Sequence, residues 1–213
     1  GMMLAVGLAY ATVFTIESIG NAQISVAGAI RDGLVTGASL ISTTGYDPHE
    51  GALAALPAPL VLILALVGGS ALSTAGGLKF YRIGGMMALA LKELRRLVYP
   101  HGVRSSRFGS NAYDLELMKG IWSSLIVALL TVSAATLLLA TTVPTFDGAL
   151  TAAISAFASV GPLYAAGFPG SESWPTYADF SVLGKLTMMA TMILGRVEVL
   201  VLFGALNLAY WRS

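Results

Sequence analysis

The sequence contains no cysteine and few charged residues. The missing cysteine excludes a disulfide framework and a metal site built from thiolates. Only 11% of the 213 residues are charged and 56% are hydrophobic, whereas about a quarter of residues are charged in ordinary soluble domains. No segment alternates in polarity as barrel strands do, and a bilayer requires backbone polar groups to be satisfied within the spanning segment. We therefore predict an all-α integral membrane protein.

Four stretches are long enough to cross a hydrocarbon core, which takes about 20 apolar residues. They cover about residues 2–19, 52–91, 118–143 and 180–208. The second is interrupted by the sequence GGSALSTAGG. Two shorter apolar segments, Ile30–Ser42 and Phe146–Ser159, follow the first and third spans. Each is too short to span, which is typical of a re-entrant helix.

The basic residues predict the orientation of the spans. Eight of the twelve Lys and Arg residues lie between the middle of the second span and the start of the third, at Lys79, Arg82, Lys92, Arg95, Arg96, Arg104, Arg107 and Lys119. The positive-inside tendency makes this connection cytoplasmic. Both chain ends are then cytoplasmic, both short helices enter from outside, and His49 and His101 lie on opposite sides, so they cannot share a metal. The chain opens on Gly-Met-Met with no basic region, which indicates a start within a longer protein.

The two short segments resemble each other. RDGLVTGASLISTTGY and FDGALTAAISAFASVGP both begin near Asp-Gly and both place a hydroxyl residue two positions before a glycine. These pairs are Thr43 with Gly45 and Ser159 with Gly161, and the glycines lie 116 positions apart. The predicted unit is span, re-entrant helix, glycine loop, span, and it occurs twice in the same orientation.

Such loops have a specific physical use. Irregular backbone at membrane depth is tolerated only where it is buried in protein or lines water, and ion filters use its carbonyl oxygens to replace an ion's hydration shell. Glycine permits the left-handed backbone that turns carbonyls to one side, and a helix C-terminus favours a cation. The predicted filter residues are Thr43, Thr44, Gly45, Tyr46, Ser159, Val160, Gly161 and Pro162.

A second candidate element is the break in the second span. Glycine costs about 1 kcal/mol relative to alanine in a helix interior, so Gly68, Gly69, Gly76 and Gly77 would open the helix around Ser73 and Thr74. The alternative is a close helix-packing surface of small residues.

Arg196 lies within the fourth span, where a charge is costly and faces the bundle interior or water, so we predict a buried arginine. Glu198 follows by only two residues and so faces another side of the helix. The arginine therefore needs a partner from another element, and the carbonyls of the broken loop are candidates. A structural arginine that pins two helices is the other interpretation.

The motifs STTGY, GGSALSTAGGLK, KELRRLVYPHGV, SVGP and ILGRVE occur here in order. On these motifs the sequence resembles the Trk/Ktr/HKT superfamily of potassium transport proteins, most closely the TrkH-type pore subunit. Members of the superfamily carry four span–loop–span repeats around one pore, and this chain looks like the last two. The resemblance implies that the glycine break and Arg196 form a constriction below the filter, and that glycine at positions 45 and 161 favours K⁺ over Na⁺. Leu163 departs from the pattern, because it replaces a glycine of the fourth filter.

We therefore expect a non-enzymatic potassium-conducting protein of the inner (cytoplasmic) membrane. Its parts are a first pore repeat over residues 1–99, a cytoplasmic connection over 100–117 and a second repeat over 118–213. K⁺ is the transported ion, and no organic cofactor is expected. The expected partners are membrane lipid, a homodimer copy or a missing N-terminal half that completes four filters, and, by resemblance, a cytosolic nucleotide-binding regulatory subunit; no nucleic acid is expected.

Other classes stay open. One is a solute symporter with its site at the broken helix, and another is a non-conducting fragment or scaffold. A Ser-Lys hydrolase pair at Ser73 and Lys79 is set aside, because the glycine break explains these residues better.

Overall fold

The computed structural model describes residues 8, 12–13, 15–16, 26–48, 52–54, 57–69, 76–98, 107–108, 111–112 and 115–197. Its main helices are α2 (Val26–Ser42), α3 (Ala58–Leu66), α4 (Phe80–Val98), α5 (Leu115–Leu139), α6 (Phe146–Ala158) and α7 (Val182–Val197). Short 3₁₀ turns are η1 (Ala52–Ala54), η2 (Gly161–Leu163), η3 (Ser171–Ser173) and η4 (Tyr177–Asp179). The prediction of a helical protein is confirmed.

One feature departs from the all-helical expectation. Two-residue strands β1 (Arg107–Phe108) and β2 (Asn111–Ala112) pair antiparallel within the predicted connection. A pairing this short needs only a tight turn between two extended dipeptides, and hydropathy along the chain carries no signal for it.

The helices meet the predicted spans unevenly. Within the described residues, the segment Gly120–Leu139 of α5 is the one helix long and apolar enough to cross a membrane. The second predicted span is divided into α3, which begins at Ala58 rather than Ala52, and α4, which runs to Val98 rather than Leu91. The fourth is described as α7 up to Val197. The first predicted span, apart from residues 8, 12–13 and 15–16, and the last part of the fourth lie outside the described residues.

Local sequence explains where α5 and α6 begin and end. The hydroxyls of Ser124, Thr131 and Thr136 donate to carbonyls three or four residues back in α5, so these polar side chains need no outside partner. The helix ends a few residues before Pro144, which cannot continue it. Thr145 then caps α6 by accepting a hydrogen bond from the Gly148 amide at 3.3 Å.

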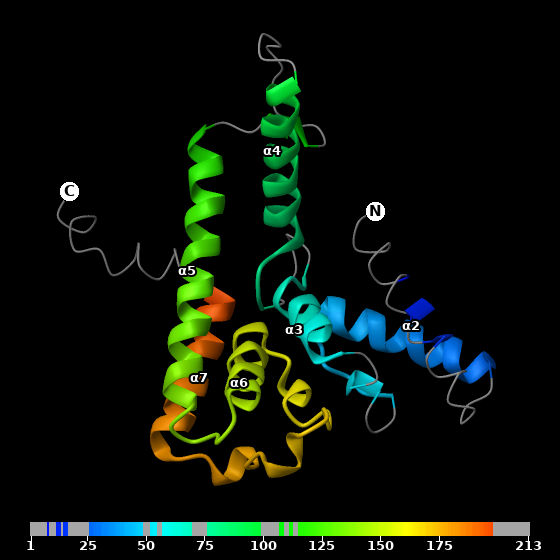
Figure 1. Cartoon of the computed structure of the whole chain (residues 1–213), viewed down its shortest axis with the longest axis vertical. Helices are drawn as coiled ribbons and strands as arrows, with labels where there is room; N and C mark the ends of the chain where they lie inside the picture. The colour runs from blue at the N-terminus through cyan, green and yellow to red at the C-terminus, as the bar shows by residue number, and fades with distance from the viewer. Residues whose placement is uncertain are drawn as a thin grey trace, which may run out of the picture.

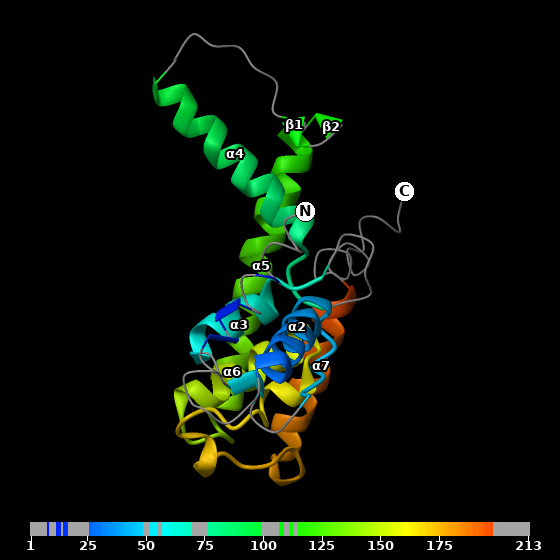
Figure 2. The ribbon, with the colours of Figure 1, turned by 90° about the vertical axis from the view of Figure 1, so that its right-hand side faces the viewer.

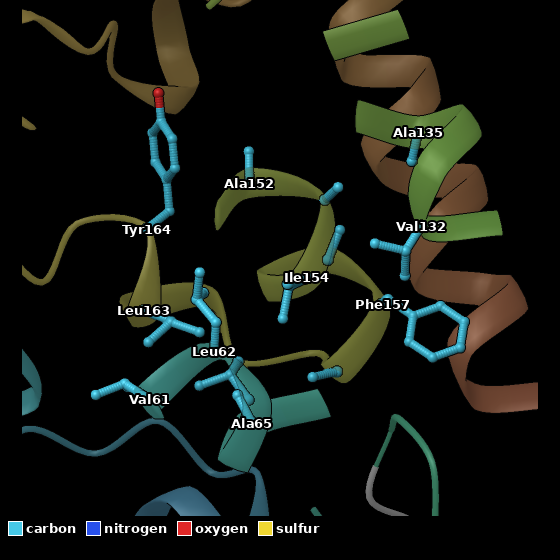
Figure 3. Packing of buried hydrophobic residues seen from close by; sticks show 14 of the residues in the cluster. Val61, Leu62, Ala65, Val132, Ala135, Ala152, Ile154, Phe157, Leu163 and Tyr164 are labelled. Atoms are coloured by element: carbon cyan, nitrogen blue, oxygen red, sulfur yellow. The ribbon is translucent and has the colours of Figure 1, made fainter. Parts of the chain in front are cut away.

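The core is centred on α6, which packs against α5, α7 and α3 (Figure 1). All residues from Gly148 to Ala158 except Leu150 are buried, and most of them are glycine, alanine, serine or threonine, so neighbouring helices approach closely. Figure 3 shows Ala152, Ile154 and Phe157 of α6 between residues of α5 and of α3. In Figure 2, α4 leans away from the rest of the molecule. Figure 1 shows α3 between α6 and α2, and α3 contacts both of them.

Candidate functional site

The helices α2 and α6 end in the same backbone geometry. Each is followed by a non-glycine residue in the left-handed region, Thr43 with φ 55° and Ser159 with φ 58°. In both, the amide of this residue donates to the carbonyl three positions back and the next amide donates five positions back, with N···O distances between 2.9 and 3.1 Å. This pattern is a Schellman motif. A β-branched residue with positive φ is a rare conformation that costs roughly 1–3 kcal/mol and tends to mark a functional site.

The two glycine loops that follow these motifs lie against each other. Gly45 has φ +73°, and a Cβ added there would lie 2.9 Å from Val160 Cγ1 and 3.0 Å from Pro162 Cδ. Residues 115 or more positions apart in the sequence are therefore brought into direct contact. Gly161 differs from Gly45, because its φ is not positive and a Cβ added there would meet nothing within 4 Å.

The predicted filter residues differ in exposure. Thr43, Gly45 and Val160 are buried, Ser159 and Gly161 are partly buried, and Thr44, Tyr46 and Pro162 are exposed. Leu163, which replaces a glycine of the family pattern, is fully buried. Figure 3 places it near Val61 and Leu62 of α3, so its side chain fills the core.

Two hydroxyl groups hold the carbonyls of the second loop. Ser155 Oγ, on α6, donates to the Val160 carbonyl at 2.7 Å. Tyr177, on η4, donates its phenolic proton to the Gly161 carbonyl at 2.7 Å. Neither residue belongs to a motif that predicts a site. The only signal for them is a serine within an alanine-rich helix and a tyrosine in a polar loop, and neither pattern is specific.

An aromatic cluster surrounds Tyr177. It comprises Tyr164, Trp174, Tyr177 and Phe180, whose neighbouring ring centroids are 5.0 to 5.7 Å apart. The Tyr164 hydroxyl donates to the Pro175 carbonyl at 3.0 Å. Burial, with a smaller effect from the neighbouring Tyr177, raises the pKa of Tyr164 to about 12. Burial also raises the pKa of Tyr177, so both phenols stay protonated donors at neutral pH.

The first glycine pair of the break packs against the end of α2. A Cβ added at Gly68 would lie 2.5 Å from Thr43 Cγ2, and the Gly69 amide donates to the Ile41 carbonyl at 2.8 Å. The absence of a side chain at Gly68 therefore lets the end of α3 reach the left-handed residue at the start of the first loop.

The second glycine pair packs against the end of α6. A Cβ added at Gly76 would lie 2.6 Å from the Ala158 carbonyl oxygen. Gly77 has φ +83°, and the amide of Leu78 next to it donates to the Leu66 carbonyl at 2.7 Å. The two ends of the break are thereby joined, with one glycine pair against the end of α2 and the other against the end of α6. Ser73 and Thr74 lie outside the described residues.

The fourth predicted span reaches the same place from the other side. Gly195 of α7 packs directly on the Phe157 carbonyl, one residue from the Ala158 carbonyl that Gly76 approaches. Gly76 of the glycine break and Gly195, the residue before Arg196, thus lie at the same end of α6. The sequence predicts a buried Arg196, whereas the structure shows its side chain exposed. Gly195 is the residue of α7 that lies against this helix end, and Arg196, about 100° further round the helix, is directed elsewhere.

The arrangement suits a cation. Two helix C-termini, each carrying a partial negative charge of about half an electron, end at two loops that lie in contact through Gly45, Val160 and Pro162. Among the described residues, no group of three His, Asp or Glu side chains is placed to hold a metal ion. Backbone oxygens are the chemistry that these loops present.

Comparison of the sequence with known proteins finds relatives among cation transport proteins. The family model of TrkH, described as cation transport protein, matches residues 2–205. The chain is 31% identical over 178 residues to the Trk system potassium uptake protein TrkH of Salmonella typhimurium, and 30% identical to TrkI of Halomonas elongata and to TrkH of Escherichia coli. These alignments cover 82% of the chain but 35% of each relative, so the chain spans about a third of the length of the relatives it matches.

The fold also matches a solved structure. The crystal structure of the potassium transporter TrkH from Vibrio parahaemolyticus superimposes with a TM-score of 0.79, at 22% identity, over 98% of this chain and 44% of that one. The family match over residues 2–205 includes both glycine loops, the glycine break and Gly195. The chain belongs to the TrkH family of cation transport proteins.

Proposed function

We propose that this chain supplies two neighbouring filter segments of a potassium-conducting pore in the inner membrane. The segments are Thr43–Tyr46 and Ser159–Pro162. The single observation that carries the proposal is the contact of Gly45 with Val160 and Pro162, because two glycine loops at helix C-termini can share an ion only if they are adjacent.

The chemistry is dehydration by carbonyl oxygens. An ion that enters loses water and gains carbonyl contacts in exchange, and the two helix ends add a favourable potential. The relatives are named as potassium uptake proteins, and both filter glycines are present here. Leu163 does not oppose this preference, because its buried side chain is directed into the core and not into the ion path.

The gate in this proposal is the glycine break with Arg196. The residues of the break are Gly68, Gly69, Ser73, Thr74, Gly76 and Gly77. The contacts of Gly68 with Thr43 and of Gly76 with Ala158 support this role, because any movement of the break is transmitted to the ends of both filter helices. The exposed guanidinium of Arg196, next to one of these ends, adds a positive charge that opposes a cation.

The same proposal assigns the rest of the chain. Residues 1–99 and 118–213 form two pore repeats, and the 100–117 connection lies on the cytoplasmic side. The matching ends of α2 and α6 support the repeat. The remaining two filters come from further sequence or a second copy, since two loops cannot surround an ion. The basic connection is then positioned to meet a cytosolic nucleotide-binding regulatory subunit.

Rubidium uptake into liposomes tests the proposal. The chain is reconstituted alone and together with the N-terminal part of a TrkH relative, and ⁸⁶Rb⁺ entry is measured with excess K⁺ or Na⁺ outside. We expect excess K⁺ to block ⁸⁶Rb⁺ uptake and excess Na⁺ to leave the uptake unchanged. We expect Gly45→Ser to abolish this difference between the two ions. Gly120→Ala on α5, where an added Cβ meets nothing within 4 Å, is the matched control. Equal block by K⁺ and Na⁺ in both preparations would refute the proposal.

A further inference from the structure

The Gly161 carbonyl is held by a side chain from a distant loop. The Tyr177 hydroxyl donates to it at 2.7 Å, across sixteen positions of sequence. Ser155 Oγ completes a small network, because it lies 3.3 Å from the Tyr177 hydroxyl and 3.4 Å from the Gly161 carbonyl, in addition to its 2.7 Å bond to Val160. The two carbonyls that follow Ser159 thus each have a side-chain donor.

Tyr177 is itself well positioned. Its ring packs against Tyr164 with centroids 5.0 Å apart and against Phe180 at 5.7 Å. On its N-terminal side, the Thr176 hydroxyl and amide both bind Asp179 Oδ2, at 2.6 and 3.3 Å, which closes η4 as a capping box. The phenol therefore has little freedom to move. Its hydrogen bond restrains the Gly161 carbonyl, and the carbonyl does not set the position of the phenol.

The first loop is held differently. Ser39 occupies the position 116 residues before Ser155, and its carbonyl makes the same Schellman bond, to Thr44. Its hydroxyl is buried, however, and has no hydrogen-bond partner within the part of the chain that the structure describes. Among the described residues, a side-chain clamp on loop carbonyls is thus found at the second loop.

We propose that Tyr177 is a positioning residue for ion selectivity, which fixes the direction of the Gly161 carbonyl. The Val160 carbonyl is not included, because it accepts from both Ser155 Oγ at 2.7 Å and the Leu163 amide at 3.1 Å, which engages both of its lone pairs. This inference rests on the proposed function. Selectivity in carbonyl filters depends on the number and field strength of the carbonyls that reach the ion. A carbonyl with one lone pair bound to a hydroxyl keeps a fixed direction and offers the ion its remaining lone pair.

The test compares two substitutions that each remove one phenolic oxygen from the same cluster. Tyr177→Phe removes the donor to the filter carbonyl, whereas Tyr164→Phe removes a donor to the Pro175 carbonyl, which lies outside the filter. Both keep their rings. The readouts are the ratio of Rb⁺ to Na⁺ permeability in liposomes and the melting temperature of the purified protein.

We expect Tyr177→Phe to lower the permeability ratio about fivefold, which corresponds to about 1 kcal/mol, the net contribution of one hydrogen bond. Tyr164→Phe should change the ratio less than twofold, while the two melting temperatures fall by similar amounts.

Two results would overturn the inference and leave the proposed function intact. One is an unchanged ratio in Tyr177→Phe, and the other is an equal loss in both tyrosine variants, which would indicate a role in stability alone. If the unmodified chain shows no preference for K⁺, alone or with the N-terminal part of a relative, the proposed function fails and this inference fails with it.

Discussion

The two filter glycines should respond differently to the same substitution. Gly45 has φ +73°, and an added Cβ would lie 2.9 Å from Val160 and 3.0 Å from Pro162. A left-handed backbone costs an alanine about 1–2 kcal/mol, and overpacking against a valine and a rigid proline ring adds roughly 1–3 kcal/mol. Gly45→Ala should therefore destabilise the protein by about 2–5 kcal/mol. Gly161→Ala has neither cost, because its φ is not positive and the added methyl group meets nothing within 4 Å.

The assay separates stability from conduction. Melting in detergent, followed by intrinsic tryptophan fluorescence, should show a fall of several degrees for Gly45→Ala and almost none for Gly161→Ala. Rubidium flux should nevertheless fall in Gly161→Ala, because the methyl group projects into open space that the proposal assigns to the ion. Equal melting temperatures in the two variants would refute the argument from φ and contact. Unchanged flux in Gly161→Ala would refute the placement of this open space on the ion path.

Three other predictions follow from the same contacts. Gly195→Ala places a methyl group against the Phe157 carbonyl and should lower the melting temperature. Gly120→Ala should raise it, because the added methyl group meets nothing within 4 Å and alanine is the better helix former. Equal shifts of the melting temperature in the two variants would contradict the packing of Gly195. Arg196→Gln should raise Rb⁺ flux severalfold by removing a positive charge near the ion path, while Arg196→Lys should leave it close to normal. Tyr164, whose pKa burial raises to about 12, should contribute stability that is complete below pH 10 and is lost between pH 10 and about 12, because the folded state holds its proton longer. A pH series of melting temperatures checks this, and the loss should be smaller in Tyr164→Phe, where Tyr177 is the remaining buried phenol.

The local features of the site were accessible from the sequence. Short apolar length predicts that residues 30–42 and 146–159 form helices too short to span, and α2 and α6 lie there, ending at Ser42 and Ala158. The sequence predicts a left-handed backbone at glycines 45 and 161, whereas the structure shows it at Gly45 but not at Gly161, and also at Thr43 and Ser159. These features depend on a few consecutive residues, and one sequence carries that information.

The features that join distant residues were not accessible. No pattern in the sequence predicts that Gly45 contacts Val160, or that the Tyr177 hydroxyl donates to the Gly161 carbonyl. These contacts depend on how α6 is placed between α3, α5 and α7. The sequence also treats Gly45 and Gly161 as equivalent, whereas their backbone angles differ.

The exposure of Arg196 has a similar cause. Hydropathy places the residue within an apolar span and so predicts burial. It does not say which face of α7 the neighbouring helices cover.

The most direct measurement is the anomalous diffraction of rubidium in crystals of the chain grown with Rb⁺, together with the N-terminal part of a relative. The account predicts a peak within coordination distance of carbonyl oxygens from both Thr43–Tyr46 and Ser159–Pro162, which weakens when K⁺ is added and persists when Na⁺ is added. A peak bound by side-chain oxygens elsewhere, or none between these two loops, would contradict the account.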